Sequence, residues 1–116
     1  MALPATVPGW LTLPDVAELL GLPIMRVRDL VRDGKLIAVR ADAESPLQVP
    51  ALVVTAAGPV KHLGAVITLL RDASYNDDEI VAWLFEADPT LPGTPAAALA
   101  ADRGTEIKRR AQALGF

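Results

Sequence analysis

Apolar residues recur at helical spacing in two short runs near the start of the chain. Residues 13–20 and residues 24–33 each place apolar side chains three and four positions apart, which is the spacing of one helix face. Thr12 precedes the first run with Asp15 three positions later, a pair typical of a capped helix start, and Gly21 ends this run. Two short helices joined by a tight turn that contains glycine predict a helix-turn-helix.

A β-hairpin is expected directly after the second predicted helix. Residues 36–40 are rich in β-branched side chains and residues 47–49 alternate, and both patterns are typical of strands. A polar loop over residues 41–46 separates the two segments, and Pro50 closes the second one. A hairpin in this position is a wing, so the pattern predicts a winged helix-turn-helix.

Helical spacing returns in the second half of the chain. Residues 51–60 fit a short helical turn followed by a connector, and the later pattern predicts four helices. These are residues 63–73, a segment capped by Asn76, residues 96–101, and residues 106–114 capped by Thr105. The expected fold class is mainly α with a small β-hairpin wing. The predicted organisation is an irregular arm over residues 1–9, a winged helix-turn-helix over 10–50 and a helical region packed on it over 51–116.

The formal net charge of −3 weighs against binding to nucleic acid, because most nucleic-acid-binding domains are basic. The distribution of charge changes this picture. All Lys and Arg residues among the first fifty positions lie between Arg26 and Arg40, on the second predicted helix and the wing. Acidic residues interleave with them. Asp42 and Glu44 in the wing loop would repel phosphate, so we expect the wing tip to point away from a nucleic acid or to contribute little.

Composition excludes several other classes of protein. Cysteine is absent and His62 is the only histidine, so a disulfide framework or a thiolate metal site is excluded. The chain shows no glycine-rich phosphate loop and no set of acid, base and nucleophile, so we expect neither an enzyme nor a bound cofactor. No apolar stretch reaches about 18 residues without a charge, which indicates a cytoplasmic protein without a membrane span. In the absence of a long heptad run we expect a monomer or a weak dimer.

The second predicted helix carries the residue types that read DNA. In a helix-turn-helix its N-terminal residues meet base edges in the major groove. Arginine suits guanine because its planar fork donates two parallel hydrogen bonds, and aspartate can accept a hydrogen bond from cytosine N4. We expect Arg26, Arg28 and Arg32 to carry most of the contact with duplex DNA, and Lys35 and Arg40 to bind the phosphate backbone. The candidate DNA-binding residues are Thr12, Met25, Arg26, Arg28, Asp29, Arg32, Lys35 and Arg40.

The same stretch resembles a known family of DNA-binding modules. TLPDVAELLGLPIMRVRDLVRDGKLIAVR resembles the winged helix-turn-helix of the MerR and excisionase type, with its capped first helix and glycine turn. DEIVAWLF and LPGTPAAALAADRGTEIKRRAQALGF resemble a small actinobacterial family in which a winged helix-turn-helix precedes a compact helical C-terminal region. The resemblance implies sequence-directed DNA binding and a role in transcription regulation, without catalysis.

Two alternatives remain open. Helical hairpins with a charged outer face are common, and most of them bind nothing. The segments 93–99 and 104–114 also resemble the helical toxin-binding region of some antitoxins, which would make the chain a protein-interaction module or a dimerisation scaffold. The cations Lys108, Arg109 and Arg110 suit the dipole at a helix C-terminus, and a second phosphate contact is the alternative interpretation.

Overall fold

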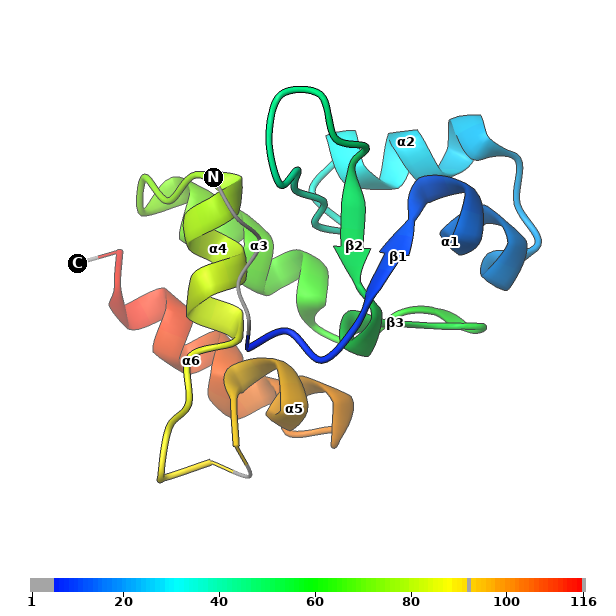
Figure 1. The fold of residues 1–116 in the computed structure, drawn as a ribbon. Helices are drawn as coiled ribbons and strands as arrows, with labels where there is room; N and C mark the ends of the chain where they lie inside the picture. The colour runs from blue at the N-terminus through cyan, green and yellow to red at the C-terminus, as the bar shows by residue number, and fades with distance from the viewer. Residues whose placement is uncertain (1–5, 92, 116) are drawn as a thin grey trace.

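The computed structural model describes residues 6–91 and 93–115 and is built mainly of helices (Figure 1). The N-terminal half consists of β1 (Trp10–Thr12), α1 (Leu13–Leu20), α2 (Ile24–Arg32) and β2 (Gln48–Pro50). The C-terminal half consists of the 3₁₀ turn η1 (Ala51–Val53), β3 (Val54–Thr55), β4 (Gly58–Pro59), α3 (Leu63–Asp72), α4 (Asp77–Leu84), α5 (Pro95–Ala100) and α6 (Gly104–Ala113). The predicted fold class, mainly α with a small β wing, is confirmed.

Local signals in the sequence define the helix-turn-helix. The Thr12 hydroxyl accepts a hydrogen bond from the Asp15 backbone at 3.2 Å, and the Asp15 carboxylate accepts one from the Thr12 backbone at 3.2 Å. This reciprocal pair satisfies two amide groups at the start of α1. Gly21 ends α1 with a φ of +66°, which a glycine adopts without strain. Pro23 then precedes α2, so both helices lie where their periodicity predicts them.

The wing hairpin is shorter than its sequence pattern suggests. One antiparallel pair, Val39 with Gln48, joins its two sides through backbone hydrogen bonds of 2.9 and 2.8 Å. The regular ladder of β2 runs instead along β1, which pairs Leu11 with Val49. Residues 36–39 are buried on all sides, with at most 4% of any residue exposed, and they pack into the core rather than extend the ladder. Three-residue strands such as β1 show too few positions for alternation to reveal them.

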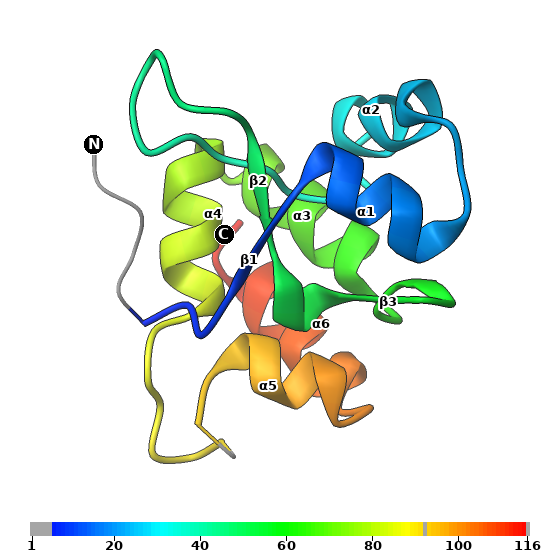
Figure 2. The ribbon, with the colours of Figure 1, turned by 45° about the vertical axis from the view of Figure 1, so that its right-hand side comes forward.

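The C-terminal half packs α6 along α3, with α4 and α5 completing the bundle (Figure 2). Asn76 forms a reciprocal cap with Glu79 at the start of α4, as its sequence predicts, and the Thr94 hydroxyl caps α5. The prediction that Thr105 caps a helix over residues 106–114 is wrong. The helix begins at Gly104, and the exposed Thr105 lies inside its first turn. Between η1 and α3 the chain forms the small hairpin of β3 and β4, which the ambiguous pattern over residues 51–60 did not reveal.

A single hydrophobic core joins the two halves. Val16 of α1 and Val27 of α2 belong to the same buried cluster as Leu63 and Ile67 of α3. Burial of each side chain of this size contributes roughly 1.5–3 kcal/mol relative to exposure. No helix within residues 6–91 and 93–115 is long and apolar enough to cross a membrane. The shared core means that α3 fixes the position of the helix-turn-helix on the C-terminal half.

A glycine contact fixes the start of α6 against the segment that leads into α3. His62, with a φ of +71°, immediately precedes α3, and its side chain lies against the backbone of the buried Gly104. A Cβ atom on Gly104 would lie 2.5 Å from His62 Cδ2 and 2.9 Å from His62 Cβ. These distances are too short for any side chain, so the packing of α6 requires glycine at this position.

Gly104→Ala should therefore lower the free energy of unfolding by roughly 1–3 kcal/mol through overpacking. Helix propensity alone would make alanine stabilising, so the sign of the change separates the two effects. The measurement is urea unfolding followed by circular dichroism. Gly9→Ala is the control, because its new Cβ meets only Ala51 Cβ at 3.7 Å. A Gly104→Ala protein as stable as the parent would contradict the contact. His62→Gly removes both the ring and the Cβ atom of His62, so a failure of this second change to lessen the effect would contradict it as well.

Candidate nucleic-acid interface

Helix α2 presents one exposed face with arginine on both flanks. Val27 is fully buried, which defines the inward direction of the helix. Successive residues turn by about 100° in a helix, so Met25, Asp29 and Arg32 align along the middle of the outward face. Arg26 and Arg28 fall on the two opposite flanks of this face by the same spacing. Met25 is 65% exposed, an unusual degree for a large apolar side chain in a position without a covering neighbour.

An open groove of about 600 Å³ runs between α2, the start of α1 and the wing. We call it the wing groove. It is lined by Leu13, Pro14, Ile24, Arg28, Val31, Arg32, Arg40, Pro46 and Leu47. The structure therefore brings Arg40 of the wing together with two of the predicted arginines of α2. Arg26 and Lys35 do not line this groove.

Ion pairing divides the cations of this region into two kinds. Arg32 contacts Asp29 at 3.1 Å and Asp33 at 3.2 Å. The hydrogen bond with Asp33 and the charge of Asp29 raise the pKa of the Arg32 guanidinium, and the two carboxylates also compensate its positive charge. Arg28 and Arg40 form no ion pair with any residue in the described ranges. The uncompensated positive charge of the wing groove therefore comes from Arg28 and Arg40.

The acidic wing loop is held by its own carboxylate. Asp42 Oδ1 accepts hydrogen bonds of 2.9 Å from the Glu44 backbone, the Ser45 backbone and the Ser45 hydroxyl. The Ser45 hydroxyl and then the Glu44 backbone lower the pKa of the Asp42 carboxyl. Arg40 donates a 2.9 Å hydrogen bond from its guanidinium to the Ser45 carbonyl. The charge of Asp42 alone predicts only repulsion of phosphate, whereas the Asp-x-x-Ser spacing of Asp42 and Ser45 is the sequence signal for this turn.

The other predicted residues lie around the same end of the molecule. The Thr12 hydroxyl is engaged in the cap of α1. Lys35 is exposed after the turn at Gly34, which has a φ of +74°.

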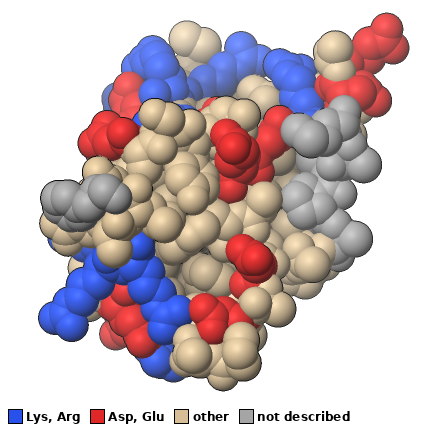
Figure 3. All heavy atoms as spheres, turned by 90° about the vertical axis from the view of Figure 1, so that its left-hand side faces the viewer, with Lys and Arg blue, Asp and Glu red and all other residues tan. Residues whose placement is uncertain are grey.

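Figure 3 shows Lys and Arg gathered along the top of the face it draws, at the level of α2 and the wing loop in Figure 1. A second group lies at the lower left, at the level of α6, with acidic and apolar surface between the two.

Comparisons with known proteins match both halves of the chain. Residues 2–53 match the family described as DNA-binding protein Rv2175c, wHTH domain, and residues 60–115 match the Rv2175c C-terminal domain of unknown function. The DNA-binding protein Rv2175c of Mycobacterium tuberculosis is 39% identical over 117 residues, which cover 90% of this chain and 79% of that protein.

The fold is similar as well. The NMR structure of Rv2175c superposes with a TM-score of 0.82 at 36% sequence identity, covering 93% of this chain and 82% of the other. These descriptions name DNA binding and do not favour the antitoxin-like alternative. The two matched segments together span nearly the whole chain. The chain therefore belongs to the Rv2175c family, in which a winged helix-turn-helix domain is followed by a helical C-terminal domain.

Proposed function

We propose that the protein binds duplex DNA through α2 and the wing and acts as a transcriptional regulator. The observation that carries this proposal is the wing groove. Arg28 and Arg40 both line it without an ion pair to any described residue, and the groove adjoins the exposed face of α2. An α-helix with its side chains is about 10–12 Å wide and fits the major groove of about 12 Å. The name of the relative supports the same partner.

The exposed face of α2 supports a division of roles among its residues. Met25 and Asp29 lie in the middle of this face, where a helix in the major groove meets base edges, and they suit a thymine methyl group and cytosine N4 respectively. Arg26 lies in the first turn of α2, within reach of a guanine. Arg28 and Arg40 in the wing groove suit phosphate, whereas Arg32 and its two carboxylates together carry a formal charge of about −1 and offer phosphate no net attraction.

The acidic balance of the chain shapes the kind of binding we propose. With a net charge of −3 the protein gains little attraction to DNA at long range. Its affinity must then come from a few contacts at short range, each of which displaces about one counterion from the duplex. A narrow footprint of this kind favours selective sites over general coating of DNA, which is the behaviour of a regulator.

The direct test is a fluorescence anisotropy titration against duplexes selected from a random-sequence library. Arg28→Ala should weaken binding to every duplex by about fivefold to tenfold at ~0.1 M salt and reduce the salt slope by about one. Arg103→Ala removes the same charge from the connection between α5 and α6 and should leave both values unchanged. If the parent protein binds no duplex at low salt, the proposed function is wrong.

Arg26→Ala should act on sequence preference rather than on general affinity. The loss is expected to be roughly 1–3 kcal/mol on the preferred site and small on duplexes that lack the matching base pair. The measurement is a second selection from the random-sequence duplex library, carried out with the variant. The selected duplexes should show a relaxed base preference at one position of the site. A uniform loss across all duplexes would show instead that Arg26 contacts phosphate.

Asp42 allows the charge of the wing tip to be separated from its turn. Asp42→Asn keeps an acceptor oxygen for the Ser45 and Glu44 donors and removes one negative charge, so DNA binding should tighten by about twofold to fivefold. Asp42→Ala removes the same charge and also the acceptor, so the loop should loosen. Amide hydrogen exchange over residues 42–45 measures the loosening. Equal exchange in the two variants would contradict the role of this carboxylate in the turn.

A further inference from the structure

A second groove lies where the two halves of the molecule meet. It has a volume of about 470 Å³ and runs between the turn after α2, the side of α3 and the outer face of α6. We call it the junction groove. Its lining residues are Asp33, Gly34, Lys35, Gly64, Ala65, Thr68, Leu69, Lys108 and Gln112. The N-terminal half thus contributes one lysine to it, and the domain of the C-terminal half contributes another.

The junction groove carries a net positive charge. Lys35 and Lys108 are both exposed, and neither forms an ion pair with any residue in the described ranges. The one carboxylate in the lining, that of Asp33, is held by Arg32 at 3.2 Å. The small residues Gly34, Gly64 and Ala65 line the groove together with the two lysines and carry no bulky side chain into it. The groove therefore suits an extended polyanion.

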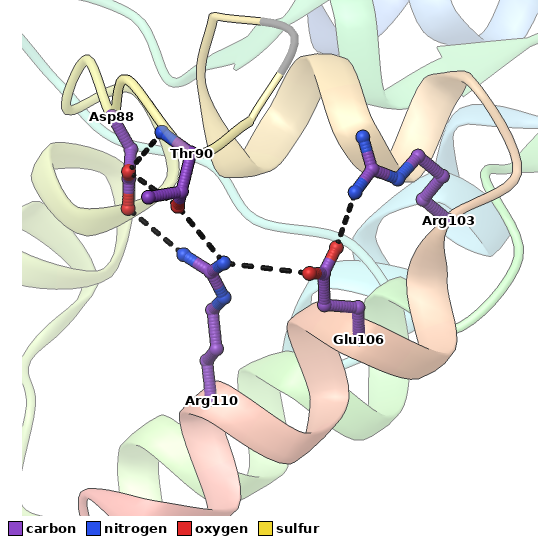
Figure 4. A network of polar contacts seen from close by, with 5 residues as sticks. All are labelled: Asp88, Thr90, Arg103, Glu106 and Arg110. Carbon is purple, nitrogen blue, oxygen red and sulfur yellow. Dashed lines mark hydrogen bonds and ion pairs between the residues drawn. The ribbon is translucent and has the colours of Figure 1, made fainter.

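Two other arginines near α6 are paired with carboxylates. Arg110 contacts Asp88 at 2.8 Å and Glu106 at 3.4 Å, and it also bonds Thr90 (Figure 4). Arg103 contacts Glu106 at 2.7 Å. These pairs tie the loop after α4 to α6 and compensate the charges of both arginines. Lys108 remains as the uncompensated cation of the α6 face that lines the junction groove.

The groove is joined rigidly to the proposed DNA-reading helix. The Lys35 backbone donates a 2.9 Å hydrogen bond to the Leu30 carbonyl, so Lys35 is fixed to the last turn of α2. On the opposite side α3 approaches this turn closely, because a Cβ on Gly64 would lie 3.7 Å from the Gly34 carbonyl. Since α6 packs along α3, the backbone at Lys108 is held by the same packing that joins α3 to the turn after α2.

We propose that the C-terminal half makes a second DNA contact, in which Lys108 and Lys35 bind one stretch of phosphate backbone that flanks the site read by α2. The inference rests on the proposed function and extends it to the domain that follows the winged helix. Lysine binds phosphate as a point charge without reading sequence. Lys108 would then lengthen the footprint and strengthen binding without changing sequence preference.

The experiment compares Lys108→Ala with Arg109→Ala, which removes the same charge from the neighbouring exposed position outside the junction groove. The probe is a selected duplex of about 30 base pairs, roughly three helical turns. Lys108→Ala should weaken binding about fivefold to tenfold at ~0.1 M salt and lower the salt slope by about one. Arg109→Ala should leave both unchanged, and Lys108→Arg should retain binding.

Duplex length provides the second arm. When the probe is trimmed by about one helical turn at one end, the parent should weaken to the level of Lys108→Ala, and the two proteins should then bind alike. Equal losses for Lys108→Ala and Arg109→Ala would overturn the proposal, as would a Lys108→Ala loss that persists on every trimmed duplex. A further measurement is the change in the NMR chemical shifts of Lys108 on titration. A change with poly-glutamate but none with the duplex would indicate that the groove binds an acidic protein segment, and it would also overturn the proposal. Failure of the parent to bind any duplex would reject the proposed function itself.

Discussion

The buried segment over residues 36–39 determines where every functional part of this molecule lies. It follows the turn after α2, carries the single pair of the wing at Val39, and joins the core cluster that includes α3. Its three large side chains, Leu36, Ile37 and Val39, together contribute about 5–9 kcal/mol of burial, comparable with the net stability of a small domain. Because α2, the wing and α3 all attach to this segment, the two grooves share one rigid frame.

Local ion pairing explains how an acidic chain can present basic surfaces. Four arginines each contact at least one carboxylate, so their positive charge is compensated by ion pairs within the protein. They are Arg32, Arg71, Arg103 and Arg110. The remaining cations in the two grooves stand apart from these pairs. The net charge of −3 therefore describes the whole protein and not the electrostatic field at α2. A count of charges along the sequence underestimates the difference between the acidic protein as a whole and its basic grooves.

Elements with local signals could be predicted from the sequence, and those with distant causes could not. The caps of α1 and α4 lie within a few residues of each helix start, so their side chains reveal them. The start of α6 depends on contact between Gly104 and His62, which are far apart in the chain. The same limit applies to the interface. Arginine on α2 indicated the chemistry, but only the fold shows that Arg32 is paired with carboxylates and that Arg28 and Arg40 line the same groove.

The shared core also bears on how the C-terminal half can act. A second domain on a flexible linker would lose conformational freedom on binding, which would offset much of the gain from one added contact. Here the close approach of Gly64 to the turn at Gly34 holds α3, and α6 packed along it, against the end of α2 in the folded protein. Any contact made by α6 is therefore already oriented when α2 reaches its partner. A single lysine on such a frame can add affinity that the same lysine on a mobile domain could not.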